Sequence, residues 1–568
     1  MIERLGKKHR QPPTSGTSGS KASSNGHSVD VFDELLTRQR PFGDSEYLIE
    51  QLHARYRQRL GKISSLLPVA GSLSSALEMA TPLRQYRTMG DPVVRHAVHQ
   101  ALRHASNGDQ GGHPPLGQPG KLASPPPPSA DGWALDDCEE VLRETLGHLE
   151  SAHREGGPLE SGGVGLRRLG RQPGDGSIWS EEHGDDLFGR SFRKIVHDNF
   201  QGEPLCTPSA ADLARLAKGA ELLGVLMPLS ARSVLSHMHL AVIVPHTGGW
   251  KRKGSCSEYM ISGTIFLNRE MLRNPWWVAE HLLHEALHQK LYDFRHTHSL
   301  LMEDLSPEPP SLENAATVHS IWNVGGATGS SGWDTFRAVA AFHVYVHLAV
   351  LCVQIERRKG ELLKRFGPAD APGPAMTQRR EAFERAQYLG RHIKQACWQE
   401  LGPAGRMLVA WLTSILNALD PAPPPSDTRY LHLVLNRYMA EATLLANREL
   451  SPEVDTRLAK LADDEAGTIR RVLIALHPDG PAIDRLNDAV ARRQDEGTGV
   501  AFLRFRRCVT GILHVLSPDG YGLRHGSSAE PTAASDEMVC AMVDGSSQQL
   551  TSLLDGSSTP LRRAPAAG

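Results

Sequence analysis

Residues 276–294 read WWVAEHLLHEALHQKLYDF, and this stretch decides the expected fold of the chain. Its apolar residues recur at helical spacing, and the pair Asn274-Pro275 in front of it is a typical helix start. Two short stretches before the helix, 239–245 and 263–268, are rich in β-branched and other apolar residues and are expected to form strands. The pattern therefore predicts a long buried helix that follows a small β element.

Within this helix, His284-Glu285-Ala-Leu-His288 carries the residue types of a metal site. Histidines four residues apart lie one above the other on a helix face, so both imidazoles can bind one divalent metal. Glu285 then points beside the metal, where a carboxylate can serve as a general base. The alternative is a solvated helix with two unrelated histidines. The apolar flanks favour burial, in which an unpartnered histidine pair is costly.

Two histidines leave a third protein ligand to be found, and the sequence offers two sources. The first source is the segment just after the helix, whose candidate carboxylates are Glu303, Asp304, Glu308 and Glu313. The second source is the next apolar helix, which contains Arg337, His343 and His347. Polar side chains in so apolar a helix need partners inside the fold. The alternative is that these histidines form hydrogen bonds in the core.

Composition excludes some classes of function. The chain has 568 residues, a formal net charge of −2 and a mean hydropathy of −0.34, so it offers no electrostatic footprint for nucleic acid. Its longest apolar run, 336–353, is interrupted by an arginine and two histidines and is expected to be a buried helix rather than a membrane span. No targeting segment is visible, and seven scattered cysteines indicate reduced thiols, so we expect a cytoplasmic protein.

Glycine, proline and apolar periodicity change along the chain and predict six regions. They are a disordered arm at 1–30, a helical region at 31–104, a Pro/Gly-rich linker with short helices at 105–207, a core with the metal site at 208–365, a helical region at 366–515 and a flexible tail at 516–568. The expected fold class is mainly α with a small β element, in which a zincin-like metal-bearing helix lies within a larger helical protein.

The order of these features resembles a known family. A strand, the His284-Glu285-Ala-Leu-His288 helix and, about fifty residues on, Arg337 followed by His343 are similar to the HExxH-motif peptide-modification family. Its members are α-ketoglutarate-dependent HExxH-type peptide β-hydroxylases associated with ribosomally synthesised modified peptides. The resembling part runs from about Gly263 to Leu351.

This resemblance implies hydroxylation of a side-chain carbon in a ribosomally made peptide, with or without a leader segment. It implies that Fe(II) is held by His284, His288 and His343, and that α-ketoglutarate is the co-substrate. The distal carboxylate of that keto acid needs a fixed cation, and Arg337 offers a bidentate guanidinium. The alternative for Arg337 is an ion pair with Asp334 or another local acid.

Two further classes of function remain open on the residues alone. A zinc metallopeptidase would use the same histidines, with Glu285 as the general base that takes a proton from the attacking water. A non-catalytic peptide-binding protein could keep the helix with the His284 and His288 pair and have no enzymatic activity. The expected partner is a peptide in each case, with no nucleic acid and no membrane.

Overall fold

The computed structural model describes residues 27–550 apart from 110–132, 152–155, 162–166, 170–175, 183–184, 306–315, 321, 323–331, 369–375, 421–430, 447–449, 477–480, 492–497 and 517–539. Helices and strands follow one another as α1 (His27–Arg38), α2 (Ser45–Ile63), α3 (Pro68–Met79), α4 (Pro82–Gly90), α5 (Pro92–Asp109), α6 (Leu135–Glu150), β1 (Arg167–Arg168), β2 (Ser177–Ile178), α7 (Leu187–Asn199), α8 (Ala210–Leu226), α9 (Pro228–Leu235), β3 (Leu240–Val244), β4 (Ser255–Ser257), β5 (Thr264–Asn268), α10 (Pro275–Thr297), β6 (Val318–His319), β7 (Gly332–Trp333), α11 (Thr335–Phe366), α12 (Arg379–His392), α13 (Pro403–Leu419), α14 (Leu431–Ala446), α15 (Pro452–Leu476), α16 (Pro481–Ala491) and α17 (Thr498–Leu516).

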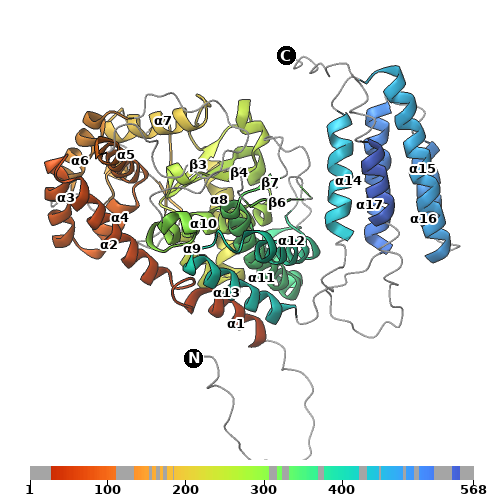
Figure 1. The fold of residues 1–568 in the computed structure, drawn as a ribbon, viewed down its shortest axis with the longest axis horizontal. Coiled ribbons are helices and arrows are strands. Elements are labelled where there is room, and N and C mark those ends of the chain that lie inside the picture. Colours follow the sequence, from red (N-terminus) through yellow and green to blue (C-terminus); the bar gives the residue numbers. More distant parts are fainter. Residues whose placement is uncertain are drawn as a thin grey trace, which may run out of the picture.

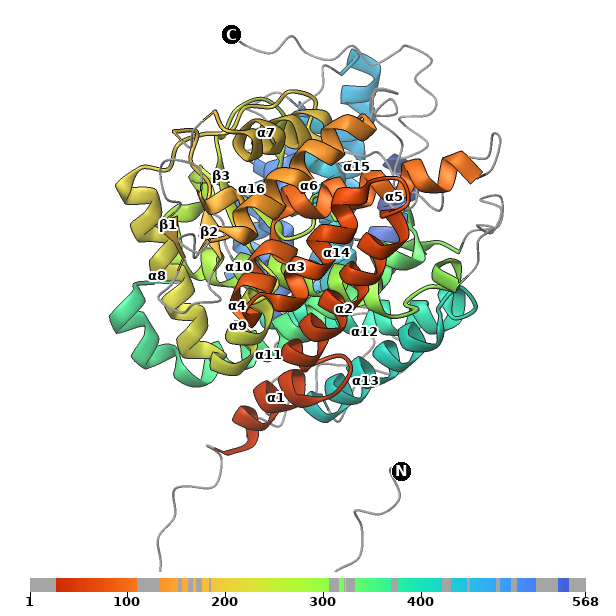
Figure 2. The ribbon, with the colours of Figure 1, turned by 90° about the vertical axis from the view of Figure 1, so that its left-hand side faces the viewer.

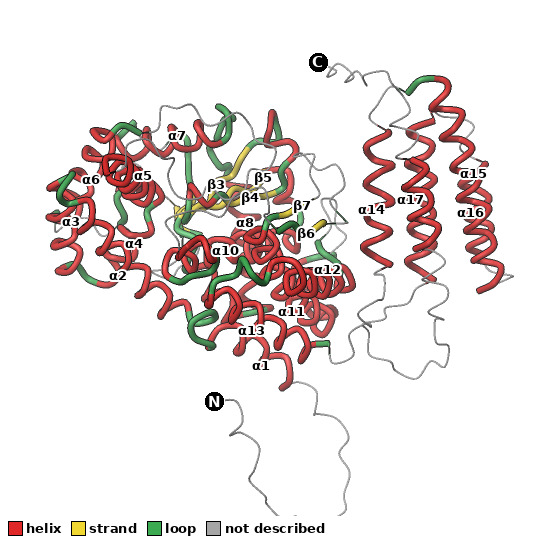
Figure 3. The backbone as a smooth tube through the Cα atoms, viewed as in Figure 1, coloured by secondary structure: helices red, strands yellow, loops and turns green. Residues whose placement is uncertain are grey.

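The helices up to α13 are arranged around a small central sheet (Figure 1). Helices α2 to α6 lie on one side of it, and α11 to α13 lie on the other side with α10 between them, as the tube in Figure 3 also shows. The view turned by 90° in Figure 2 places the N-terminal helices in front of the rest. The protein is therefore mainly helical with a small β element, which confirms the predicted fold class.

The sheet has the strand order β1-β2-β3-β5-β4. Strands β2, β3 and β5 are parallel neighbours, whereas β4 pairs antiparallel with β5 at the edge. Every side chain of β3 and β5 is buried, as expected for strands covered on both faces. The sequence predicts these two strands correctly, but it does not reveal the edge strand β4.

Successive residues of β3 and β5 alternate between two hydrophobic cores, because strand side chains point to opposite faces. Ala241, Ile243 and Ile265 belong to the core shared with α8 to α13. Val242 and Phe266 belong to the core shared with α2 to α7. The central sheet thus separates an N-terminal helical layer from the layer that contains α10 and α11.

Helix α11 is the one helix in the described part of the chain that is long and apolar enough to cross a membrane. Its most apolar window has a mean hydropathy of 1.9, and 78% of that window is buried inside the fold. This burial is that of a core helix in a soluble protein, as expected for 336–353 from its internal polar residues.

The C-terminal helices α14 to α17 form a bundle with a hydrophobic core of their own, and α14 packs against α12 (Figure 1). At its centre lies Arg506, which is fully buried. Its guanidinium pairs with Glu465 at 2.7 Å and Glu441 at 3.1 Å, and it lies 3.9 Å from the ring centroid of Tyr438. The buried charge is therefore compensated within the bundle.

The structure corrects two of the predicted regions. The stretch 105–207 is not mainly a linker where it is described, because α6, β2 and α7 contribute buried residues to the two cores. The stretch 516–568 is not a flexible tail throughout, because 540–550 is helical and buries Cys540 and Val543 in the bundle. Most of the predicted arm at 1–30 lies outside the described residues, and α1 begins at His27.

Candidate functional site

Helix α10 is the central element of the candidate site, and its N-terminus is fixed by a capping residue and a proline. The Asn274 side chain accepts a hydrogen bond from the Trp276 amide at 3.0 Å, and Pro275 occupies the first helical turn. From Trp276 to Phe294 every side chain is buried except three, which are half-buried. These three are His281, His284 and His288. Solvent therefore reaches this part of the helix through a stripe of imidazoles, which we call the histidine stripe.

The rings of the histidine stripe are close to one another. The centroids of His284 and His288 are 4.9 Å apart, as expected for residues on adjacent turns. His281 stacks on Trp277 at 3.8 Å, lies 5.7 Å from His284, and places its Nδ1 3.0 Å from the Trp277 carbonyl oxygen. Burial lowers the pKa of all three imidazoles, that of His281 to about 3. They are therefore neutral at pH 7, which is the form that binds metals.

His281 was missed in the sequence analysis, although its spacing contained a signal. Residues three before His284 and seven before His288 fall on the same helix face. The HExxH pattern draws attention to two histidines, whereas the helical period adds the third.

The Glu285 carboxylate is held by the edge strand β4, and its charge raises the pKa of His284 against the effect of burial. The carboxylate is buried and accepts hydrogen bonds from the hydroxyls of Ser255 at 2.5 Å and Ser257 at 2.7 Å, both on β4. Each carboxylate oxygen is thus bound by one serine of the edge strand. The glutamate of the motif ties α10 to the sheet in this structure.

Arg337, in the first turn of α11, has no acceptor for one of its guanidinium nitrogens. The Asp334 carboxylate caps the helix by accepting the Arg337 amide at 2.7 Å, and no ion pair joins the two side chains among the described residues. The guanidinium lies 4.9 Å from the ring centroid of Trp333, and its Nη1 is buried without a partner in the described part of the chain. Burial and the charges of His284 and Arg337 lower the pKa of His288. Phe336, the residue before Arg337, has its ring 6.1 Å from that of Tyr292, which in turn lies 6.3 Å from that of His288.

The structure does not bring His343 into a ligand set with His284 and His288. His343 and His347 are buried on α11 with ring centroids 4.7 Å apart, and the Nδ1 of His347 lies 2.8 Å from the His343 carbonyl oxygen. The Nδ1 of His343 is buried and has no partner among the described residues. Across the described ranges, no group of three or more His, Cys, Asp or Glu side chains is placed to hold a metal ion.

The alternative carboxylate ligands are used elsewhere or fall outside the description. Glu303 and Asp304 both pair with Arg295, and Asp304 also accepts the Leu301 amide at 2.8 Å. Glu308 and Glu313 lie outside the described residues. The histidine pair thus fits two positions around a divalent metal, while a third ligand is not assembled, and we derive no catalytic step through a metal.

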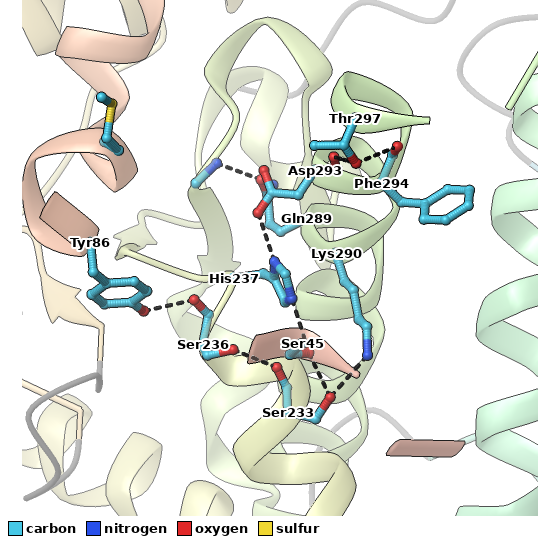
Figure 4. A network of polar contacts seen from close by, with 12 residues as sticks. Ser45, Tyr86, Ser233, Ser236, His237, Gln289, Lys290, Asp293, Phe294 and Thr297 are labelled. Atoms are coloured by element: carbon cyan, nitrogen blue, oxygen red, sulfur yellow. Dashed lines mark hydrogen bonds and ion pairs between the residues drawn. The ribbon is translucent and has the colours of Figure 1, made fainter. Parts of the chain in front are cut away.

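The opposite side of α10 carries a second polar cluster, which is closed and fully partnered (Figure 4). Asp293 binds the Nδ1 of His237 at 2.7 Å and the Nη1 of Arg95 at 2.9 Å, and the Nε2 of His237 lies 3.0 Å from the Ser45 hydroxyl. Lys290 donates to the Gly43 carbonyl oxygen at 2.6 Å. Although burial alone would raise it, the pKa of Asp293 is held below its usual range by the charge of Arg95 and the hydrogen bond from His237.

In this closed cluster a serine, a histidine and an aspartate are hydrogen-bonded in series, as in a catalytic triad. Their burial indicates a structural role. Ser45, His237 and Asp293 are all buried, and they come from α2, the segment after α9, and α10. Gln289, one turn before Asp293, adds a link to the sheet by accepting the Gly263 amide at 2.5 Å and donating to the Thr264 carbonyl at 2.8 Å. The cluster therefore fixes α10 against the N-terminal helices and β5.

No protein-family model matches this chain, and no curated protein matches it. The resemblance carried by the motif and by Arg337 and His343 therefore stays a prediction.

Proposed function

We propose that this protein is a metal-dependent enzyme that hydroxylates a side-chain carbon of a peptide, with α-ketoglutarate as co-substrate. The observation that carries this proposal is the buried, unpartnered Nη1 of Arg337 beside the histidine stripe. A buried guanidinium nitrogen without an acceptor is costly unless a ligand supplies one, and a carboxylate is its best partner.

The setting of Glu285 favours this proposal over a zinc peptidase. A general base for hydrolysis accepts a proton on a carboxylate oxygen that faces the metal-bound water. Both oxygens of Glu285 instead accept hydrogen bonds from Ser255 and Ser257. Glu285 then serves to hold α10 on β4, while His284 and His288 supply two of the metal ligands.

The described residues do not assemble a third ligand, so this ligand is part of the proposal. His343 is our candidate, because its buried Nδ1 has no acceptor or donor among the described residues. Fe(II) and α-ketoglutarate would supply the oxidising chemistry when bound, with O₂ as the oxidant: the keto acid would leave as succinate and CO₂, and one oxygen atom would enter the C–H bond of the peptide. Seven free cysteines in the described chain are in keeping with a cytoplasmic enzyme.

Binding of α-ketoglutarate to the anaerobic Fe(II)-loaded protein tests the role of Arg337. Removing one partner of a buried charged pair typically costs about 2–5 kcal/mol, so Arg337→Ala should weaken binding by about 30-fold or more. Arg337→Lys should restore part of the affinity, because an ammonium keeps the charge but loses the bidentate geometry. Iron content should stay unchanged.

Arg365→Ala is the matched control, because this arginine lies on the same helix and is 54% exposed. Equal affinity in wild type and Arg337→Ala, or no binding in either, contradicts the role given to Arg337. Peptide cleavage without the keto acid would favour the zinc peptidase instead. A protein that binds peptide and has neither activity would be the non-catalytic alternative.

A further inference from the structure

Three aromatic side chains stand beside the histidine stripe, and we call them the aromatic wall: Tyr259, Tyr292 and Phe336. The Tyr292 ring lies 6.3 Å from that of His288, measured between centroids. Phe336 lies 6.1 Å from Tyr292 and 6.3 Å from Tyr259. These residues come from α10, α11 and the 3-10 turn Tyr259–Ile261, so the fold brings them together from three elements.

The aromatic wall is held rigidly. The Tyr259 ring stacks on His296 at 4.9 Å, and its hydroxyl lies 3.1 Å from the Nδ1 of that histidine. The Arg295 guanidinium lies 4.7 Å from the Phe336 centroid and 5.5 Å from that of Tyr259. Because Arg295 is itself paired with two carboxylates, it supports the rings as a neutralised group. A preorganised surface of this kind binds without first ordering its side chains.

The wall is also accessible, and it is continuous with the proposed site. Tyr259 and Phe336 are half-buried, as are the imidazoles of the histidine stripe, whereas Tyr292 is buried behind them. Phe336 directly precedes Arg337, the proposed anchor of the keto acid. Partly exposed aromatic rings on a fixed support can bury further apolar surface when a ligand packs against them.

We propose that the aromatic wall is a specificity subsite that binds an aromatic or large aliphatic side chain of the peptide substrate. This inference rests on the proposed function, which places the reacting residue at the histidine stripe. An extended peptide advances about 3.3 Å per residue, and the two steps of 6.3 and 6.1 Å from His288 to Phe336 place the anchor within about four residues of the reacting one.

Charge decides against a cationic side chain at this subsite. Aromatic faces attract cations, but Arg295 already lies against two rings of the wall and Arg337 follows Phe336. A further lysine or arginine would find these two rings already in contact with a guanidinium and would meet the like charge of Arg337. An acidic side chain would instead compete for Arg337 with the co-substrate. A large neutral apolar side chain is therefore the occupant that the wall fits.

A synthetic pool of random decapeptides tests the subsite on the full-length, anaerobic Fe(II)-loaded protein, with and without α-ketoglutarate. Bound peptides are identified by mass spectrometry. Wild type should retain peptides that contain Phe, Tyr, Trp or Leu about fivefold or more better than peptides that contain none of the four, as expected for burial of one such side chain. Phe336→Ala should abolish most of this enrichment, and Phe336→Leu should keep part of it.

The matched control is Met79→Ala, which removes an apolar side chain that is 88% exposed on α3. Phe336→Ala should bind α-ketoglutarate as wild type does, since Arg337 is intact. No enrichment by wild type, or equal enrichment by Phe336→Ala, overturns the subsite. Enrichment that depends on Phe336 in a protein that never binds the keto acid would keep the subsite and reject the proposed oxygenase.

Discussion

Along α10, the side that meets solvent carries imidazoles, whereas the side that meets α2, α5 and α9 carries Asp293 and Lys290 with their partners in place. On the solvent side, the Nδ1 of His288 is buried with no hydrogen-bond partner among the described residues. On the inner side, both oxygens of Asp293 are bound. One helix therefore shows two different arrangements of polar groups.

The difference separates what holds the helix from what the helix presents. A buried charge that is fully partnered is costly to disturb, because removal of one member leaves the others desolvated and alone. A half-buried neutral imidazole can be removed without such a penalty. We therefore expect stability to depend on the inner side of α10, and ligand binding to depend on the solvent side.

Asp293→Ala should show the largest effect, a loss of about 3–5 kcal/mol in the free energy of unfolding, because Arg95 stays buried without its counter-charge. Denaturant unfolding measures this loss. Asp185→Ala is the control, since its side chain is 91% exposed and its removal should change stability by less than about 0.5 kcal/mol. A loss below about 1 kcal/mol for Asp293→Ala would show that the closed cluster does not hold α10.

Glu280, which α10 buries against the segment before α12, should make stability depend on pH. Burial raises its pKa to about 7, and it accepts the Thr377 amide at 2.7 Å. Between the ordinary value of 4.5 and pH 7 the folded state binds more protons than the unfolded state, so stability should fall as pH rises. The slope is at most about 1.4 kcal/mol per pH unit.

Unfolding midpoints of wild type and Glu280→Gln across pH 4.5–7.5 test this dependence. The amide cannot ionise, so the variant should lose the fall in stability that the carboxyl causes. Parallel curves for the two proteins would assign the pH dependence to other groups.

Glu285→Ala should have an intermediate effect, because it removes the acceptor of two serine hydroxyls. We expect a loss of about 1–3 kcal/mol in stability, with peptide hydroxylation retained in the folded fraction. Glu361→Ala, an exposed glutamate with 65% side-chain exposure, is the control. Unchanged stability with complete loss of peptide cleavage would instead give Glu285 the role of a general base.

His284→Ala and His288→Ala should have the smallest effect on stability, within about 1 kcal/mol, while abolishing metal binding. Metal content after anaerobic reconstitution, together with unfolding curves, measures both quantities. His343→Ala should also lower metal affinity strongly, and His347→Ala should lower it less. Global unfolding of the His284 or His288 variant would identify the metal as structural.

Local patterns in the sequence were sufficient to predict many of the helices and strands of the fold. The strands β3 and β5 follow from β-branched runs, and α10 and α11 follow from apolar periodicity and their capping residues. The edge strand β4 has the sequence Ser-Cys-Ser, which has no strand signature, and its pairing depends on β5. The helical segment 540–550 was missed because its partners are the preceding bundle helices.

The candidate site was only partly predictable, because contacts between elements that are distant in the sequence leave no local pattern. Spacing along one helix predicts that His284 and His288 are neighbours, and the structure gives 4.9 Å between their rings. Whether His343 joins them depends on how α11 packs against α10, which spacing alone does not determine. The buried pair of Arg95 and Asp293 could not be inferred either, since these residues are 198 positions apart.

That separation also sets the order of events during synthesis. A ribosome adds about 5–20 residues per second, so Arg95 leaves it about 10 to 40 s before Asp293. During this interval α2 and α5 exist without the carboxylate that their buried polar groups bind in the finished protein. The N-terminal helices thus complete their packing only after α10 has been made. In a nascent chain that ends before α10, this helical layer is incompletely packed and is accessible to chaperones and proteases.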